Sequence, residues 1–286
     1  MVSLLRGVLV VALCSCKFHP PTDTGSDGAI DVSKIDTPPG VTGHLLLTEI
    51  QPNGNFEFIE IYNPTDLPVD LSTYYLSDSN EYWKLSAHIA GTSLINLISS
   101  DFVVQFPPST LAPDAVAVVA MDGPGFVAEY GTVTPRYTIR GQASGAMQMI
   151  NVIPVTAQQS TITDSGEMVV LFQWDGVSDL VRDVDLVVAG NSPDPANAPA
   201  PKQDVDGVDG DIKSSSYAHD DFSIGDMATD AGGKMSFKRL MREGTNERRG
   251  GGNGITGDDE TSEQQRLTWD DASSIGTPGV IPLTLR

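Results

Sequence analysis

The clearest chemical pattern in the chain is a row of aspartates and glycines at residues 204–211, which read DVDGVDGD. Its carboxylates belong to Asp204, Asp206, Asp209 and Asp211. Hard cations such as Ca²⁺ take several oxygen ligands, and glycines allow the tight turn that would bring carboxylates together. The pattern matches part of a D-x-D-G calcium loop, but it lacks the terminal glutamate of such a loop and has no predicted flanking helices. We therefore favour a solvated acidic loop and keep a Ca²⁺ site as the alternative.

Three other patterns could support catalysis, and each has a simpler explanation. Asp183 and Asp185 share one face of a predicted strand and could act as acid and base, but charged strand residues usually face water. Residues 252–257 read G-x-G-x-x-G, yet no strand is predicted before them and no helix after them, so they do not indicate a dinucleotide site. His219 and the two aspartates that follow it could bind a metal, but no H-x-x-x-H or C-x-x-C motif accompanies them.

The usual nucleophile motifs are missing from the sequence. There is no G-x-S-x-G, and both cysteines, Cys14 and Cys16, precede the predicted domain. A metal-dependent hydrolase would need His44, His88 and His219 to meet among carboxylates, which makes it the weakest alternative. We predict that the protein is not an enzyme.

The overall charge bears on the choice of partner. The chain has 286 residues, of which 38 are acidic and 17 are basic, and its formal net charge is −21. Such a surface repels nucleic-acid phosphates at long range. The composition therefore disfavours a nucleic-acid partner and suits solubility or divalent cations.

The N-terminus predicts export and lipid attachment. Arg6 precedes a short apolar run at residues 7–13, which is too short to span a bilayer and is typical of a secretory signal. The run ends in L-C-S-C at residues 13–16, the order of a bacterial lipobox. We therefore expect cleavage before Cys16 and lipidation of that cysteine, which would make the membrane a partner through a lipid anchor.

This pattern divides the chain into three parts. Residues 1–15 are the predicted signal peptide, residues 16–43 are a flexible tether rich in Pro, Thr, Asp, Ser and Gly, and residues 44–286 are the predicted folded domain. Lys17 follows the candidate cysteine, which favours the outer membrane or cell surface. A freely secreted protein is the alternative.

Short runs of β-branched and aromatic residues, separated by turn residues, fill most of the predicted domain. They predict an antiparallel all-β domain. One helical turn is expected at residues 126–131, and residues 212–236, which are polar and weakly patterned, are expected to form a long loop. The expected strands lie at residues 44–50, 56–62, 69–71, 74–76, 82–85, 102–106, 115–121, 180–188 and within 161–174.

Two of these segments resemble the opening of lamin tail domains. Residues 57–64 read EFIEIYNP, and residues 69–78 read VDLSTYYLSD. D-x-G-E at residues 164–167 and Thr-Pro-Gly at residues 277–279 resemble later steps of the same family. The resemblance implies an immunoglobulin-like antiparallel β-sandwich of the lamin tail type, with long loop insertions, over residues 44–286.

The resemblance implies a fold and names no activity. Bacterial members occur in secreted and surface proteins, and the domain of animal lamins binds protein partners and chromatin. We predict a non-catalytic, lipid-anchored cell-surface binding or scaffold module whose partner is an unidentified protein or surface ligand. A Ca²⁺-dependent adhesion or carbohydrate-binding module is the alternative.

Overall fold

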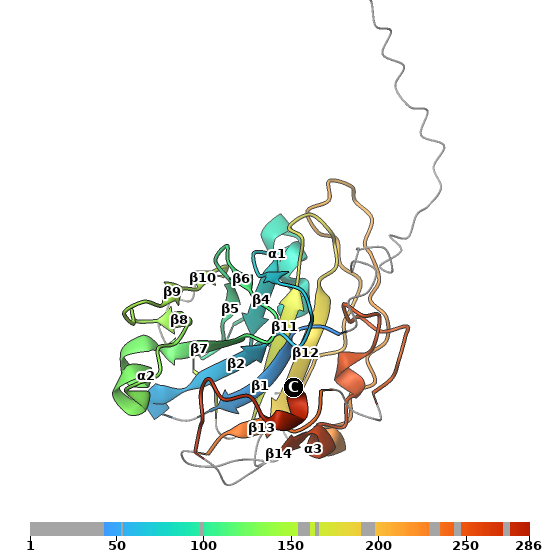
Figure 1. Ribbon diagram of the computed structural model, residues 1–286. Coiled ribbons are helices and arrows are strands. Elements are labelled where there is room, and N and C mark those ends of the chain that lie inside the picture. Colours follow the sequence, from blue (N-terminus) through green and yellow to red (C-terminus); the bar gives the residue numbers. More distant parts are fainter. Residues whose placement is uncertain are drawn as a thin grey trace, which may run out of the picture. The chain divides into compact units, whose positions relative to one another are not determined.

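Two β-sheets form the frame of the predicted domain (Figure 1). The computed structural model describes residues 43–52, 54–97, 100–153, 161–163, 166–189, 198–228, 235–242, 247–270 and 275–286. The predicted signal peptide, Cys16 and nearly all of the tether lie outside these residues.

The larger sheet has seven strands in the order β14-β13-β1-β2-β7-β8-β9. Their bounds are Trp269–Asp270 (β14), Phe237–Arg239 (β13), Leu46–Gln51 (β1), Phe58–Tyr62 (β2), Val116–Asp122 (β7), Tyr137–Arg140 (β8) and Met147–Gln148 (β9). β13 and β14 come from the end of the chain and pair beside β1, so the C-terminal part completes this sheet.

The second sheet has five strands in the order β10-β5-β4-β11-β12. Their bounds are Ile150–Asn151 (β10), Val103–Gln105 (β5), Tyr74–Ser77 (β4), Glu167–Gln173 (β11) and Arg182–Ala189 (β12). β3 (Val69–Asp70) and β6 (Thr110–Leu111) form a separate two-stranded ladder. The described part of the chain therefore confirms the predicted all-β sandwich.

Two strand pairs depart from the antiparallel expectation, because β7 pairs with β8 and β8 with β9 in parallel. A parallel pair needs a crossover connection rather than a tight hairpin. Helix α2 (Gly123–Tyr130) lies in the connection from β7 to β8, at the predicted helical turn. Asp122 ends β7 and also caps α2, since its Oδ2 accepts a hydrogen bond from Gly125 N at 2.9 Å.

Apolar side chains of both sheets meet in the main core. The seven-stranded sheet contributes residues such as Leu47 and Ile59, and the five-stranded sheet contributes residues such as Leu76 and Leu171. All four are at most 1% exposed. Burial of apolar surface between the two sheets is therefore the main force that holds them face to face.

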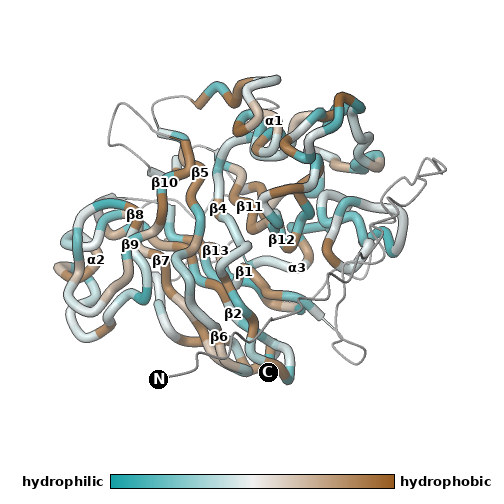
Figure 2. Tube along the Cα trace, turned by 90° about the horizontal axis from the view of Figure 1, so that it is seen from above, coloured by the Kyte–Doolittle hydropathy of each residue, from teal (hydrophilic) through white to brown (hydrophobic). Residues whose placement is uncertain are grey.

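A second core covers the other face of the five-stranded sheet. Tyr75 of β4 and Phe172 of β11 stack at 5.3 Å between ring centroids, and Val205 and Met227 belong to the same cluster. Figure 2 shows the hydrophobic stretches of β11 and β12. Residues 212–228 therefore pack on the sheet rather than extend into solvent, because Tyr217 and Phe222 contact this cluster.

The strand expected at residues 82–85 is wrong. These residues form a 3₁₀ turn, η3 (Tyr82–Lys84), and the start of helix α1 (Leu85–Ala90). Tyr82, Trp83 and Leu85 are buried in the second core. An apolar run of this length is compatible with a strand or a helix, and the need to cover a sheet face decided the outcome here.

The open edge of β12 is covered by polar groups of distant segments. The Gln265 side-chain amide donates to Leu186 O at 3.1 Å and accepts from Val188 N at 2.6 Å, as a neighbouring strand would. The glycine-rich segment 252–257 also lies along β12, where Ile255 N donates to Asp183 O at 2.7 Å. This contact gives the G-x-G-x-x-G segment a structural role at the sheet edge.

Candidate metal site and buried charge networks

The acidic segment meets the β11–β12 connection. Ligand oxygens of Asp206 and Asp209 lie within 4.8 Å of one another and of Asp179. Asp179 also holds the segment in place, because its Oδ1 accepts from Gly207 N at 2.8 Å and its Oδ2 accepts from Ser215 Oγ at 2.7 Å. A side chain at Gly207 would place its Cβ 2.9 Å from Asp179 Cα, so this close approach requires glycine.

Of the four aspartates considered as Ca²⁺ ligands from the sequence, only Asp206 and Asp209 belong to this group. Asp204 and Asp211 are exposed and lie outside the group, and Asp211 Oδ1 instead accepts from Lys213 N at 2.7 Å. Asp206 Oδ1 is buried and has no hydrogen-bond partner among the described residues. Sequence reasoning missed Asp179 because it lies in another connection, far from the acidic repeat.

No histidine of the described residues belongs to this group. His88 Nδ1 accepts a hydrogen bond from Ile95 N at 3.1 Å, and His219 is 80% exposed beside Asp221. His44 is buried and lies 3.9 Å from Glu260, between Nε2 and Oε2. The described residues therefore do not bring the histidines to the carboxylates in the way that a hydrolytic metal centre requires.

Asp183 and Asp185 do not face water, contrary to the expectation for a charged strand face. Each is 1% exposed. Asp185 pairs with the buried Arg239 guanidinium, which also lies 3.0 Å from Glu263, between Nη1 and Oε1. Burial raises the pKa of Asp185 to about 7, and the adjacent Arg239 opposes this shift.

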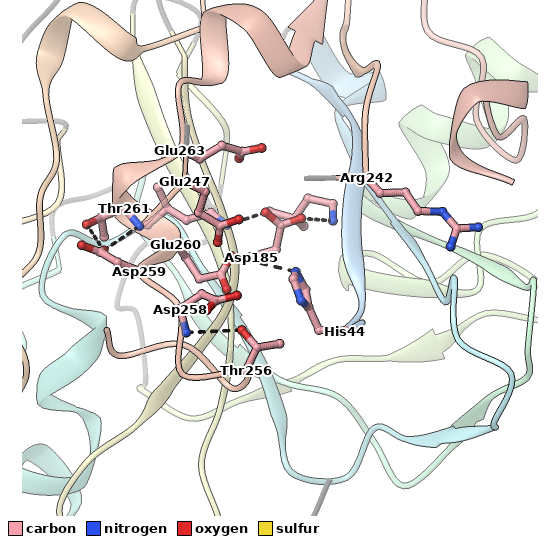
Figure 3. A network of polar contacts seen from close by, with 12 residues as sticks. His44, Asp185, Arg242, Glu247, Thr256, Asp258, Asp259, Glu260, Thr261 and Glu263 are labelled. Carbon is pink, nitrogen blue, oxygen red and sulfur yellow. Dashed lines mark hydrogen bonds and ion pairs between the residues drawn. The ribbon is translucent and has the colours of Figure 1, made fainter. Parts of the chain in front are cut away.

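A buried acidic network extends from Asp185 toward the C-terminal loops (Figure 3). Glu260 is 5% exposed, and burial, together with nearby Glu247, Asp185 and Glu263, raises its pKa well above its usual range. Its Oε1 has no hydrogen-bond partner among the described residues. These surroundings favour the protonated form of Glu260, which lies in the interior of the domain.

Two buried glutamates of the central strands, Glu49 in β1 and Glu60 in β2, hold a distant turn in place. Glu60 is fully buried; its Oε2 accepts from Gly279 N at 2.6 Å and its Oε1 accepts from Thr48 Oγ1 at 2.9 Å. Glu49 Oε1 accepts from Thr277 N at 2.9 Å. The Thr-Pro-Gly segment at residues 277–279, the closing turn of the domain, is thus held against the central strands β1 and β2.

Asn63 explains the rest of that motif. Its buried side chain donates to the carbonyls of Leu67 at 2.8 Å, Leu111 at 3.0 Å and Ala112 at 3.1 Å, and it accepts from Thr65 N at 3.0 Å. One side chain therefore satisfies backbone groups of two separate loops, which a turn residue of another type could not do.

These features define an immunoglobulin-like β-sandwich with long loops around its sheets. The family model of the lamin tail domain matches residues 38–185, more than half of the chain. The chain belongs to the lamin tail domain family.

A crystal structure of a DUF4876 family protein from Bacteroides thetaiotaomicron VPI-5482 is similar at 14% sequence identity. The match covers 84% of this chain and 72% of that one, with a TM-score of 0.45. No curated protein sequence matches the chain. None of the helices in the described residues has the length and apolar character needed to cross a membrane.

Proposed function

We propose that the protein is a non-catalytic binding or scaffold module, exported and held by a lipid on Cys16 at the outer membrane or cell surface. The observation that carries this proposal is the L-C-S-C order at residues 13–16 after a short apolar run, ahead of a lamin tail domain. A cysteine carrying several acyl chains would anchor firmly, since each buried methylene contributes about 0.8 kcal/mol. The partner is an unidentified protein or surface ligand, and the net charge of −21 disfavours nucleic acid.

Intact-mass analysis of the protein extracted from its native host, combined with membrane fractionation, tests the anchor. We expect the wild type to begin at Cys16, to carry acyl mass and to enter the membrane fraction. The Cys16→Ala variant is expected to be soluble. Cys14→Ala is the matched control and should stay acylated. Wild-type protein that is soluble and unacylated would contradict the anchor and leave the freely secreted alternative.

A second candidate function is Ca²⁺-dependent adhesion or carbohydrate binding through the acidic segment. The observation that favours it is the convergence of Asp179, Asp206 and Asp209, together with the unpartnered Asp206 Oδ1. Three carboxylates, with backbone carbonyls and water, suit the oxygen coordination of Ca²⁺.

Thermal unfolding in excess Ca²⁺ and in chelator tests this candidate. At a Ca²⁺ concentration about 100 times the dissociation constant, binding adds about 2.7 kcal/mol of stability, which raises Tm by several degrees. Asp206→Asn should abolish the increase, while Asp211→Asn should retain it. Equal transitions of the wild type under both conditions would rule the site out.

A further inference from the structure

Lys202 is a lysine enclosed with two carboxylates. Its side chain is 1% exposed. Its Nζ lies 2.6 Å from Asp183 Oδ2 and 3.1 Å from the Asp220 carboxylate. Lysine side chains are almost never buried to this extent unless a group of opposite charge pairs with them, and here the amine is in contact with a carboxyl group.

Aromatic side chains enclose the three charged groups. The ring centroids of Tyr82 and Tyr217 lie 5.7 and 5.6 Å from Lys202 Nζ. Tyr82 also donates its hydroxyl to Asp183 Oδ1 at 2.6 Å. Water therefore has little access to the amine. Asp183 accepts from Lys202 Nζ at Oδ2 and from the Tyr82 hydroxyl at Oδ1.

Asp220 is the group that can donate and accept protons beside the amine. Burial raises its pKa, and the adjacent Lys202 opposes this shift. Its Oδ1 accepts from Asn253 Nδ2 at 2.6 Å, while its Oδ2 has no hydrogen-bond partner in the part of the chain that the structure describes. Burial also disfavours charge on Lys202, but the two carboxylates outweigh that effect and raise its pKa. The amine consequently needs a neighbouring proton acceptor before it can react.

We propose that Lys202 and Asp183 condense spontaneously into an intramolecular isopeptide bond, with Asp220 moving the protons and Tyr82 stabilising the developing oxyanion.

The reaction balances without any co-reactant. Asp220, in its protonated form, gives a proton to the Asp183 carboxylate and takes one from the Lys202 ammonium. The neutral amine then attacks Asp183 Cγ, and the Tyr82 hydroxyl stabilises negative charge on Oδ1. The Cγ–Oδ2 bond breaks as Asp220 passes the excess amine proton to Oδ2. The products are an amide and one water, and Asp220 ends as it began.

Two physical effects favour this product over the ion pair. Groups held in reactive geometry reach effective concentrations of about 10⁵–10⁸ M, which compensates for the cost of forming an amide in water. Condensation also replaces two buried charges with a neutral amide, and so removes a desolvation penalty. The bond would join β12 to the segment that covers the second core, in a domain that has no cysteine of its own.

The chain contains a matched control pair. Lys84 and Glu81 also form an ion pair, but their side chains are 19% and 23% exposed. No second carboxylate is in contact with Lys84 among the described residues. We expect no condensation there, because water solvates both groups and nothing beside them accepts the amine proton.

Tryptic digestion of the denatured full chain, followed by mass spectrometry, tests the bond directly. Cleavage after Arg182, Lys202 and Lys213 would give fragments 183–202 and 203–213 from an unlinked chain. An acylated Lys202 resists trypsin, so we expect fragment 183–213, lighter than its sequence mass by one water. Cleavage after Lys84 should proceed normally. Fragments 183–202 and 203–213 at full mass would show a salt bridge only and overturn the proposal.

Variants assign the role of each group. Asp183→Asn should still link, with loss of one ammonia in place of one water. Lys202→Arg should leave Asp183 unmodified, and Asp220→Asn should prevent or greatly slow the mass loss while circular dichroism confirms folding. Linkage of Lys202 to Asp220 in the wild type would overturn the assignment of Asp183 as the acceptor.

Discussion

Replacing Arg239 by methionine is expected to lower the free energy of unfolding by about 3–5 kcal/mol at neutral pH. Arg239 is 2% exposed, contacts Asp185 and Glu263, and donates from Nε to Leu47 O at 2.9 Å. Methionine has a similar volume, so the variant removes the cation without opening a large cavity. Two buried carboxylates then lose their cation, and the carbonyls of Leu47, Met241 and Arg242 lose a hydrogen-bond donor. Urea unfolding followed by circular dichroism measures the change.

An exposed arginine is the control for this variant. Arg266 is 53% exposed and lies 3.5 Å from Asp226. Ion pairs in solvent contribute at most about 1 kcal/mol, so Arg266→Met should change stability by no more than that. The defect of Arg239→Met should also shrink at acidic pH, where protonation of Asp185 removes its unpaired charge. A loss of less than 1 kcal/mol for Arg239→Met would show that the network is hydrated in solution.

Glu60→Gln is expected to stabilise the protein at alkaline pH. Burial raises the pKa of Glu60 from 4.5 to about 8, although hydrogen bonds from Gly279 N and Thr48 favour its charged form. A carboxyl group with a raised pKa contributes its full stability below pH 4.5, and that contribution is lost as the pH rises toward 8. A shift of this size corresponds to about 5 kcal/mol as an upper bound.

The glutamine variant has no proton to lose at residue 60, so its stability should fall less than that of the wild type as the pH rises. Its carbonyl oxygen can accept from Gly279 N, and its amide can donate to Thr48 Oγ1, so both contacts survive. Urea midpoints at pH 5 and pH 8.5 measure the difference between the two proteins. The exposed Glu129→Gln is the control and should follow the wild type. Parallel curves for wild type and Glu60→Gln would contradict a protonated Glu60.

These networks bear on how the domain is stabilised after export. Neither cysteine lies in residues 44–286, so no disulfide can constrain the predicted domain. Its interior instead contains ion pairs such as Lys202–Asp183 and Asp185–Arg239. Such pairs stabilise a fold weakly when compared with apolar packing, but they are costly to break on one side. A covalent link between Lys202 and Asp183 would convert one of them into a constraint on the unfolded chain.

Local sequence determined most of the strands, because alternation, β-branched residues and turn residues act over a few positions. The opening motif also indicated the family, and the structure gives the reason for its residues. Asn63 satisfies the carbonyls of a neighbouring loop, and Glu60 holds the closing turn at Gly279. The helical turn that ends at Gly131 was likewise predicted from local residues.

Only the tertiary structure decided which strand faces are buried. Asp183 and Asp185 alternate as a solvent-facing pair would, yet segments from the C-terminal part of the chain cover them. The same covering turned residues 82–85 into η3 and the start of α1, and it placed Asp179 beside Asp206. A local pattern predicts the periodicity of a segment but not what packs on it. The packing partner can lie far away in the sequence, as Tyr217 lies 134 residues from Trp83, and burial of the whole sheet selects it.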